Sequence, residues 1–207
     1  MRIITPSTEI INATPNLEAT IERCTRVCYK SEGLICEGSA LKIIRKCLDS
    51  HHESVLEHGA ITVHFVVDRG ITHEIVRHRI ASFSQESTRY VCYAKEQHGR
   101  GIGVIKPVEI VDGSHSFNVW WDACLGAESA YLKLIDLGEK AQNARSVLPT
   151  CTKSEIMVTA NPREWRWIFT KRIPGDAHPD MRHVMRPLLL GFQDRWPAIF
   201  GNLSFRG

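Results

Sequence analysis

The chain has 207 residues, enough for one domain with a sizeable hydrophobic core, and we expect residues 1–207 to form a single domain. Its 26 basic and 23 acidic residues leave a formal net charge of +3, which is far from the strong basic bias of nucleic-acid-binding proteins but compatible with small anionic ligands. No apolar run approaches the roughly 18 residues of a membrane span, so neither a nucleic acid nor a membrane is an expected partner.

The seven cysteines are scattered along the chain, and none of them forms a C-x-x-C pair. The N-terminal residues do not resemble a secretory signal. Reduced thiols in the cytoplasm are the simplest explanation of this cysteine usage.

The first part of the chain predicts a short strand and two helices. Residues 2–4 form the candidate strand, and Thr14-Pro15-Asn16 is typical of a helix start. Ser39 is expected to cap the second helix. The inward stripe of that helix is predicted to be Leu41, Ile44 and Leu48.

A strand and a helix are predicted next. Residues 60–67 alternate apolar and polar side chains, which is the pattern of a half-buried strand. Residues 71–79 predict a helix that places Glu74, Arg77 and His78 on one face. Residues 89–93 are candidates for a returning strand.

The second half predicts further helices around one strand. Residues 116–137 form the longest predicted helix, and its buried side is expected to include Phe117, Trp120, Cys124, Tyr131, Leu134 and Leu137. A further helical turn carries Arg145, and residues 156–160 predict a strand. Asn161 caps the next helix, with proline at its first position. The last helix is expected to bury Met181, Val184, Met185 and Leu188.

Residues 51–58, HHESVLEH, leave three interpretations open. Three histidines and two glutamates would suit a metal, but their spacing is not that of H-E-x-x-H, and we expect no metal site. A polar loop with capping side chains is the structural alternative. A loop that contacts a cofactor is the third.

Residues 73–90, HEIVRHRIASFSQESTRY, are rich in arginine, histidine and hydroxyl side chains. Arginine offers a planar fork of donors that matches a phosphate, and hydroxyl groups complete the acceptor positions. The stretch therefore favours an anion site, although a solvated polar loop has the same composition.

The order of these residues resembles the signature of flavin-dependent thymidylate synthases, RHRxxSxNxxSxRY. Here the stretch is RHRIASFSQESTRY, so seven of the eight fixed positions of the signature match, and Ser84 replaces asparagine at the eighth. The family has a segment similar to His52, Ser54, Glu57 and His58 that lies against the flavin. It also has a run similar to residues 144–149 whose arginine contacts the nucleotide.

The resemblance implies an α+β fold, a small sheet packed by several helices, that works as a homotetramer with active sites shared between subunits. It implies reductive methylation of dUMP to dTMP, with methylenetetrahydrofolate as carbon donor and FAD reduced by NADPH as hydride source. No cysteine nucleophile is required.

Site residues follow from the resemblance position by position. Arg172 is the expected catalytic residue, because an arginine at the N3/O2 edge of uracil stabilises the charge that activates C5. The residues expected to contact dUMP are Glu74, Arg77, Gln85, Glu86, Ser87, Thr88, Arg89, Arg145 and Arg172. The residues expected to contact FAD are His52, Ser54, Glu57, Arg77, His78, Arg79, Asn161, Arg163 and His178. Trp167 is expected to pack in the core.

Two other functions stay open. The same arginines, with Tyr90, Trp120 and Trp121 as stacking surfaces, would suit a non-enzymatic RNA- or nucleotide-binding module. A family member that binds flavin without making dTMP is the second, and the Ser84 substitution is one reason to consider it.

Overall fold

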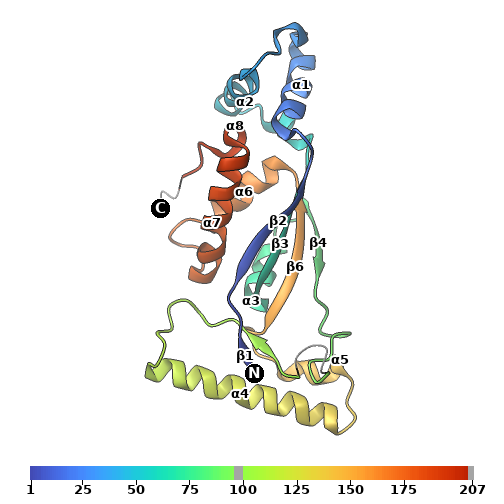
Figure 1. The fold of residues 1–207 in the computed structure, drawn as a ribbon, viewed down its shortest axis with the longest axis vertical. Helices are drawn as coiled ribbons and strands as arrows, with labels where there is room; N and C mark the ends of the chain where they lie inside the picture. Colours follow the sequence, from blue (N-terminus) through green and yellow to red (C-terminus); the bar gives the residue numbers. More distant parts are fainter. Residues whose placement is uncertain (96–99, 205–207) are drawn as a thin grey trace. The chain divides into compact units, whose positions relative to one another are not determined.

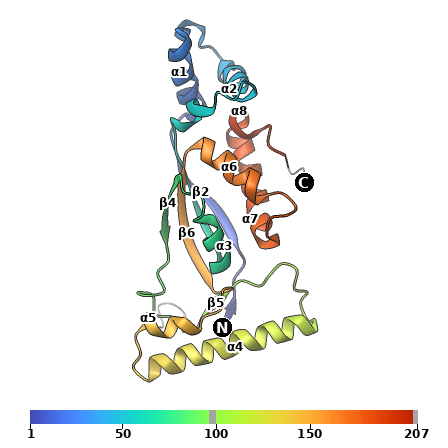
Figure 2. The ribbon, with the colours of Figure 1, turned by 180° about the vertical axis from the view of Figure 1, so that it is seen from behind.

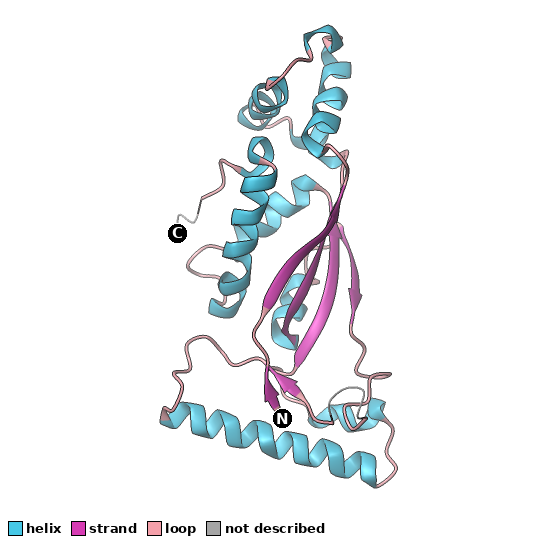
Figure 3. Cartoon of the chain, viewed as in Figure 1, coloured by secondary structure: helices cyan, strands magenta, loops and turns pink. Residues whose placement is uncertain are grey.

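The computed structural model describes residues 1–95 and 100–204. Figure 1 shows the chain coloured along the sequence, and Figure 3 shows its helices and strands. The helices of the described residues are α1 (Leu17–Tyr29), α2 (Ser39–Asp49), α3 (Arg69–Ile75), α4 (His115–Asp136), α5 (Ala141–Ala144), α6 (Pro162–Arg172), α7 (Pro179–Arg195) and α8 (Pro197–Phe200). The strands are β1 (Arg2–Ile3), β2 (Ser7–Ala13), β3 (Ile61–Asp68), β4 (Ala81–Gln85), β5 (Gly103–Val104) and β6 (Lys153–Ala160).

The strands form a four-stranded sheet with the order β2-β3-β6-β4 and a two-stranded parallel sheet of β1 and β5. Small sheets with several helices make this an α+β fold, as predicted. The chain folds into two compact units. The first unit is Met1–Ser7, Phe65–Arg77 and Ser84–Ile156, and the second is Thr8–His64, His78–Phe83 and Met157–Gly207. The expected single domain stays a prediction.

The first unit has a core beside the long helix α4. Ser114 caps this helix by accepting a hydrogen bond from the Phe117 N–H at 3.1 Å. Cys124 and Tyr131 are its buried residues, and the Tyr131 hydroxyl accepts from the Tyr93 N–H at 3.2 Å. The chain from α5 through the short 3₁₀ helix Arg145–Val147 packs against α4. This packing sets the position of Arg145.

The second unit has an aromatic core made by α6, α7 and α8, which lie together in Figures 1 and 2. Phe192 is in contact with the rings of Trp165, Phe169 and Phe200, with centroid distances of 5.3, 5.1 and 4.9 Å. The Trp165 indole is fully buried and donates to the Ile61 carbonyl at 3.0 Å. This core holds α6 rigidly, and α6 carries much of the candidate site.

Much of the predicted secondary structure is confirmed. The strand at residues 60–67 is β3, and its four alternating apolar side chains are all buried. The helix at 116–137, the strand at 156–160 and the last helix correspond to α4, β6 and α7. Asn161 caps α6 as predicted, since its side chain accepts from the Glu164 N–H at 2.8 Å.

Several expectations were wrong. The helix predicted over 71–79 begins at Arg69, because Asp68 caps it, and ends at Ile75. Arg77 and His78 therefore do not share a helical face with Glu74. Residues 89–93 do not form a strand. Leu41 and Leu137, expected inside, are 46% and 73% exposed.

Strands β2, β4 and β5 and helix α8 had not been predicted, and one cap was misassigned. Strand β2 lies at the edge of its sheet and alternates between half-buried and exposed residues, so it has no strong apolar pattern. Helix α8 is only four residues long. Gly38, with φ of 71°, precedes α2, and the Ser39 hydroxyl instead lies 2.7 Å from Glu22 Oε1. Among the helices of the described residues, none combines the length and apolar character needed to cross a bilayer.

Candidate functional site

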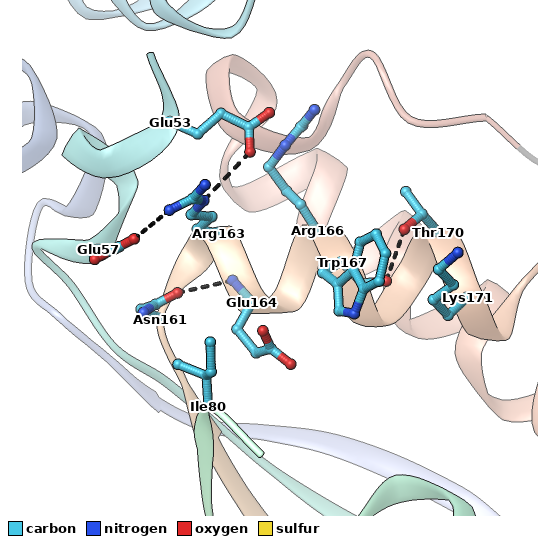
Figure 4. Close-up of a pocket in the computed structure, with 10 residues that line it drawn as sticks. All are labelled: Glu53, Glu57, Ile80, Asn161, Arg163, Glu164, Arg166, Trp167, Thr170 and Lys171. Atoms are coloured by element: carbon cyan, nitrogen blue, oxygen red, sulfur yellow. Dashed lines mark hydrogen bonds and ion pairs between the residues drawn. The ribbon is translucent and has the colours of Figure 1, made fainter. Parts of the chain in front are cut away.

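A pocket of about 750 Å³ lies along α6 in the second unit (Figure 4). Its lining comes from α6, from the 3₁₀ helix Glu53–Glu57 and from the segment before β4. The lining residues are Glu53, Glu57, Ile80, Asn161, Arg163, Glu164, Arg166, Trp167, Thr170 and Lys171. The N-terminus of α6 faces this pocket, so backbone N–H groups and the helix dipole favour an anion there.

Arg163 is the cation closest to the start of α6 in this pocket. Its Nη1 lies 2.6 Å from Glu57 Oε1, and its Nε lies 3.6 Å from Glu53 Oε2. The arginine side chain is 51% exposed, so these ion pairs contribute little to stability and can be exchanged for a ligand anion. All three side chains line the pocket.

Trp167 and Lys171 form the other end of the pocket. The Lys171 ammonium lies 4.4 Å from the centroid of the indole, in a cation–π arrangement, and Figure 4 shows the two side chains beside each other. Trp167 is 52% exposed, so the expectation that it packs in the core was wrong. A solvent-facing indole next to a cation is suited to a planar ring that carries negative charge.

His78, Glu164 and Arg172 are connected in the second unit. The buried His78 imidazole accepts a hydrogen bond at Nε2 from Arg172 Nε at 3.0 Å, and its Nδ1 lies 3.5 Å from Glu164 Oε1. Burial, and then the Arg172 charge, lower the pKa of His78 to about 4. The imidazole is therefore neutral at pH 7. Burial also raises the pKa of Glu164.

A second polar cluster lies in the first unit around Glu86. The carboxylate accepts from the Tyr93 hydroxyl at 2.8 Å and from the Lys153 ammonium at 3.1 Å. The neighbouring Gln85 amide donates to the hydroxyls of Thr72 and Ser154 at 2.9 and 3.2 Å. Residues 85 and 86 are thus held in fixed positions at the end of β4.

Two arginines lie at the turn after β4: Arg145, which reaches it from the 3₁₀ helix Arg145–Val147, and Arg89, which belongs to it. Arg145 Nη1 donates to the buried Thr88 hydroxyl at 3.2 Å. Arg89 is exposed, with its guanidinium carbon 5.5 Å from the centroid of the exposed Tyr90 ring. The Ser87 hydroxyl accepts from the Arg89 N–H at 3.4 Å. An exposed arginine fork beside hydroxyl groups is an arrangement that can bind a phosphate.

The sequence matches the family model described as thymidylate synthase complementing protein over residues 9–198. The flavin-dependent thymidylate synthase of Geobacter sulfurreducens is 31% identical, with 92% of this chain and 84% of that protein covered. The enzyme of the same name from Mycolicibacterium vanbaalenii is 30% identical, with 90% and 79% covered.

The chain belongs to the flavin-dependent thymidylate synthase family.

The fold agrees with a solved structure as well. The UMP/dUMP methylase PolB from Streptomyces cacaoi, crystallised with 5-Br dUMP, superimposes with a TM-score of 0.79 at 22% identity. The alignment covers 97% of this chain and 96% of that one. In the present chain, the family signature runs from the residues after α3, along β4, to the exposed turn at Arg89 and Tyr90.

The residues expected at the flavin are only partly brought together. Three of them, Glu57, Asn161 and Arg163, line the pocket, and His78 reaches it through Glu164. The lining does not include the exposed residues His52, Ser54, Arg79 and His178. His52 Nδ1 lies 3.3 Å from the Tyr29 hydroxyl, and His178 Nδ1 accepts from the Asp180 N–H at 3.3 Å. Arg77 belongs to the first unit.

The residues expected at the nucleotide, apart from Arg172, all lie in the first unit. Residues 85–89 are contiguous there, and Arg145 joins them through Thr88. Arg172 lies in the second unit with His78. Each unit thus contains most of one predicted set.

Residue-by-residue inference missed a face of α6. Four residues that were not predicted to contact a ligand also line the pocket: Arg166, Trp167, Thr170 and Lys171. The spacing was the available signal: Arg166 and Trp167 follow Arg163 by three and four residues, and Thr170 and Lys171 follow Trp167 by three and four, so all share one face of a helix. For the described ranges 1–95 and 100–204, no cluster of three metal-ligating side chains is found.

Proposed function

We propose that this protein converts dUMP to dTMP by reductive methylation. Methylenetetrahydrofolate would supply the carbon, and FAD reduced by NADPH would supply the hydride. Membership of the family supports the reaction class, and relatives carry the name flavin-dependent thymidylate synthase. The structural observation that carries the proposal is the α6 pocket, because its chemistry suits a flavin dinucleotide.

The pocket residues fit FAD on three counts. Its volume of about 750 Å³ lies within the range of roughly 300–1,000 Å³ that is usual for cofactor and ligand pockets. Arg163, Lys171 and the N-terminus of α6 provide positive charge for a diphosphate. Trp167 provides a surface for one of the two ring systems. Bound FAD, once reduced by NADPH, would supply the hydride, while Glu57, Asn161 and Arg163 would hold and orient the cofactor.

The remaining expected flavin contacts, His52, Ser54, Arg77, His78, Arg79 and His178, stay part of the proposal. The exposed residues among them are accessible to a ligand. His78 would lie at the flavin as a neutral imidazole, since its pKa is lowered to about 4.

The nucleotide would be bound by Glu74, Arg77, Gln85, Glu86, Ser87, Thr88, Arg89, Arg145 and Arg172. Arg89 and Ser87 would hold the phosphate, because an exposed guanidinium can make two parallel hydrogen bonds to it. Arg172 would face the N3/O2 edge of uracil. One well-placed donor at developing negative charge contributes about 3–4 kcal/mol of transition-state stabilisation. This charge stabilisation makes C5 nucleophilic without a cysteine.

A homotetramer with active sites shared between subunits completes the proposal. The exposed apolar residues Val119 and Leu125 on α4 support a subunit contact, being 57% and 38% exposed. Light scattering after gel filtration tests the tetramer. A cytoplasmic location stays a prediction, supported by seven cysteines that are all free thiols.

The function is tested by measuring dTMP from dUMP with FAD, NADPH and methylenetetrahydrofolate, and by omitting each in turn. We expect product only with all components. Arg172→Ala should keep the flavin but lose methylation, and normal dTMP formation by this variant would contradict its role. Flavin binding without dTMP in the wild type would favour the alternative of a non-synthesising family member.

Arg89→Ala tests the phosphate contact. We expect the dUMP dissociation constant to rise about tenfold or more, because a charge-assisted pair of hydrogen bonds is lost. Arg195→Ala removes another exposed arginine, on α7, and should leave dUMP binding unchanged. An unchanged dissociation constant in Arg89→Ala would refute the phosphate assignment.

A further inference from the structure

Three residues of the second unit, Glu164, His78 and Arg172, form a chain of polar contacts. Arg172 Nε donates to His78 Nε2 at 3.0 Å, and His78 Nδ1 lies 3.5 Å from Glu164 Oε1. We infer that Glu164 is a positioning residue for Arg172. Glu164 selects the His78 tautomer whose Nε2 accepts the Arg172 Nε–H, and this hydrogen bond fixes the guanidinium. What Arg172 then does for the substrate rests on the proposed function.

The tautomer follows from the donor and acceptor inventory. An arginine Nε–H can only donate, so the His78 Nε2 it contacts must present a lone pair. A neutral imidazole has a single N–H, which must then be at Nδ1. The only carboxylate recorded at that nitrogen, among the described residues, is Glu164. Glu164 therefore stabilises the same tautomer that Arg172 requires.

The surroundings of the three residues favour a fixed arrangement. His78 is 6% exposed and Glu164 is 8% exposed, so neither group can exchange its partner freely for water. Glu164 lies in the first turn of α6, whose start is fixed by the Asn161 cap, and Arg172 lies in its last turn. Figure 4 shows the Glu164 carboxylate pointing away from Arg163, so it does not belong to the Arg163 ion pairs.

The consequence concerns the orientation of a long, flexible side chain. A histidine that carried its proton on Nε2 would present a donor to the Arg172 Nε–H and displace the guanidinium. With Glu164 in place, the acceptor is prepared before a substrate binds, and the arginine loses less conformational freedom on reaching the reacting geometry. The carboxylate thus acts through the histidine and does not itself contact uracil.

The test compares Glu164→Leu with Glu164→Gln in the full chain with bound FAD. Leucine is similar in size but cannot accept a hydrogen bond, whereas the glutamine amide oxygen can still accept from Nδ1–H. The readouts are the tautomer of His78 from ¹⁵N shifts of histidine-labelled protein, the exchange rate of the Arg172 Nε–H, and the kcat and KM for dUMP. Glu22→Gln, at another buried carboxylate, which Arg26 and Ser39 contact, is the control for lost buried charge.

We expect Glu164→Leu to shift His78 to a mixture of tautomers, to expose the Arg172 Nε–H to exchange, and to lower kcat by about 10- to 100-fold, as for a misplacement of roughly 1 Å. Glu164→Gln should stay within a few-fold of the wild type in all readouts. Glu22→Gln should lower the unfolding temperature without changing the tautomer.

An unchanged tautomer and unchanged Nε–H protection in Glu164→Leu would overturn the inference. Equal losses in the leucine and glutamine variants would also overturn it, because they would mean that charge and not the hydrogen-bond acceptor matters. If the wild type made no dTMP, the proposed function would fail, while the tautomer and exchange measurements would still decide the role of Glu164.

Discussion

The buried His78 makes a quantitative prediction about stability and pH. Its pKa falls from an ordinary 6.5 to about 4 on folding, because burial and the Arg172 charge disfavour the imidazolium. Between these two values the unfolded chain binds a proton that the folded chain excludes, so the free energy of unfolding should fall as pH falls from about 6.5 to about 4. The shift corresponds to about 3 kcal/mol, at about 1.4 kcal/mol per pH unit.

The assay is urea unfolding of the wild type and of His78→Gln at several pH values between 4 and 7. Glutamine keeps hydrogen-bonding capacity but does not titrate, so the wild-type advantage over the variant should shrink by about 3 kcal/mol across this range. Glu164, whose pKa burial raises, contributes with the opposite sign in both proteins.

His115→Gln, at an exposed histidine that begins α4, is measured in the same way as the control for a histidine-to-glutamine change outside the buried contact. Parallel pH curves for the wild type and His78→Gln would show that His78 titrates normally, and would refute the argument that it is held neutral.

Three further changes follow from the same structure. Trp165→Ala should lower the free energy of unfolding by about 3–5 kcal/mol in urea titrations, because it leaves a cavity in the aromatic core; a loss below about 1 kcal/mol would contradict that packing. Asn161→Ala should cost about 1 kcal/mol in the same assay, as for other lost helix caps, and no loss would mean that the cap is dispensable. Lys153→Met removes the ammonium that donates to the Glu86 carboxylate, so calorimetry should show a rise in the dUMP dissociation constant of about 5- to 10-fold, and unchanged affinity would count against a role of Glu86 in binding.

The strongest sequence predictions were those that rest on local periodicity or on contiguous residues. Strand β3 alternates cleanly, and α4 is long enough to show its helical pattern despite burying few residues. The Asn161 cap is a local hydrogen bond between residues three apart. Such features depend little on the rest of the chain.

Contacts between distant residues could not be derived in this way. His78 and Arg172 are 94 residues apart in sequence, and their hydrogen bond depends on how α6 packs. The contact between Arg145 and Thr88 spans 57 residues. The resemblance predicted roles for these four residues, but not that His78 contacts Arg172 or that Arg145 contacts Thr88.

Trp167 shows an error that the sequence could have avoided. The inward face of α6 carries Trp165, Ile168 and Phe169, and a residue two positions from Trp165 lies on the opposite side of a helix. Aromatic character alone was therefore a poor guide. The same geometry explains why Arg163, Trp167 and Lys171 share the pocket face.

The central claim is tested most directly by a single turnover. The FAD-loaded protein, reduced in the absence of oxygen, is mixed with dUMP and methylenetetrahydrofolate, and both dTMP and the flavin absorbance are measured. We predict that dTMP forms in step with reoxidation of the flavin, one molecule for each flavin, in the wild type but not in Arg172→Ala. Flavin that stays reduced with no dTMP formed, or a protein that binds no FAD at all, would contradict the account.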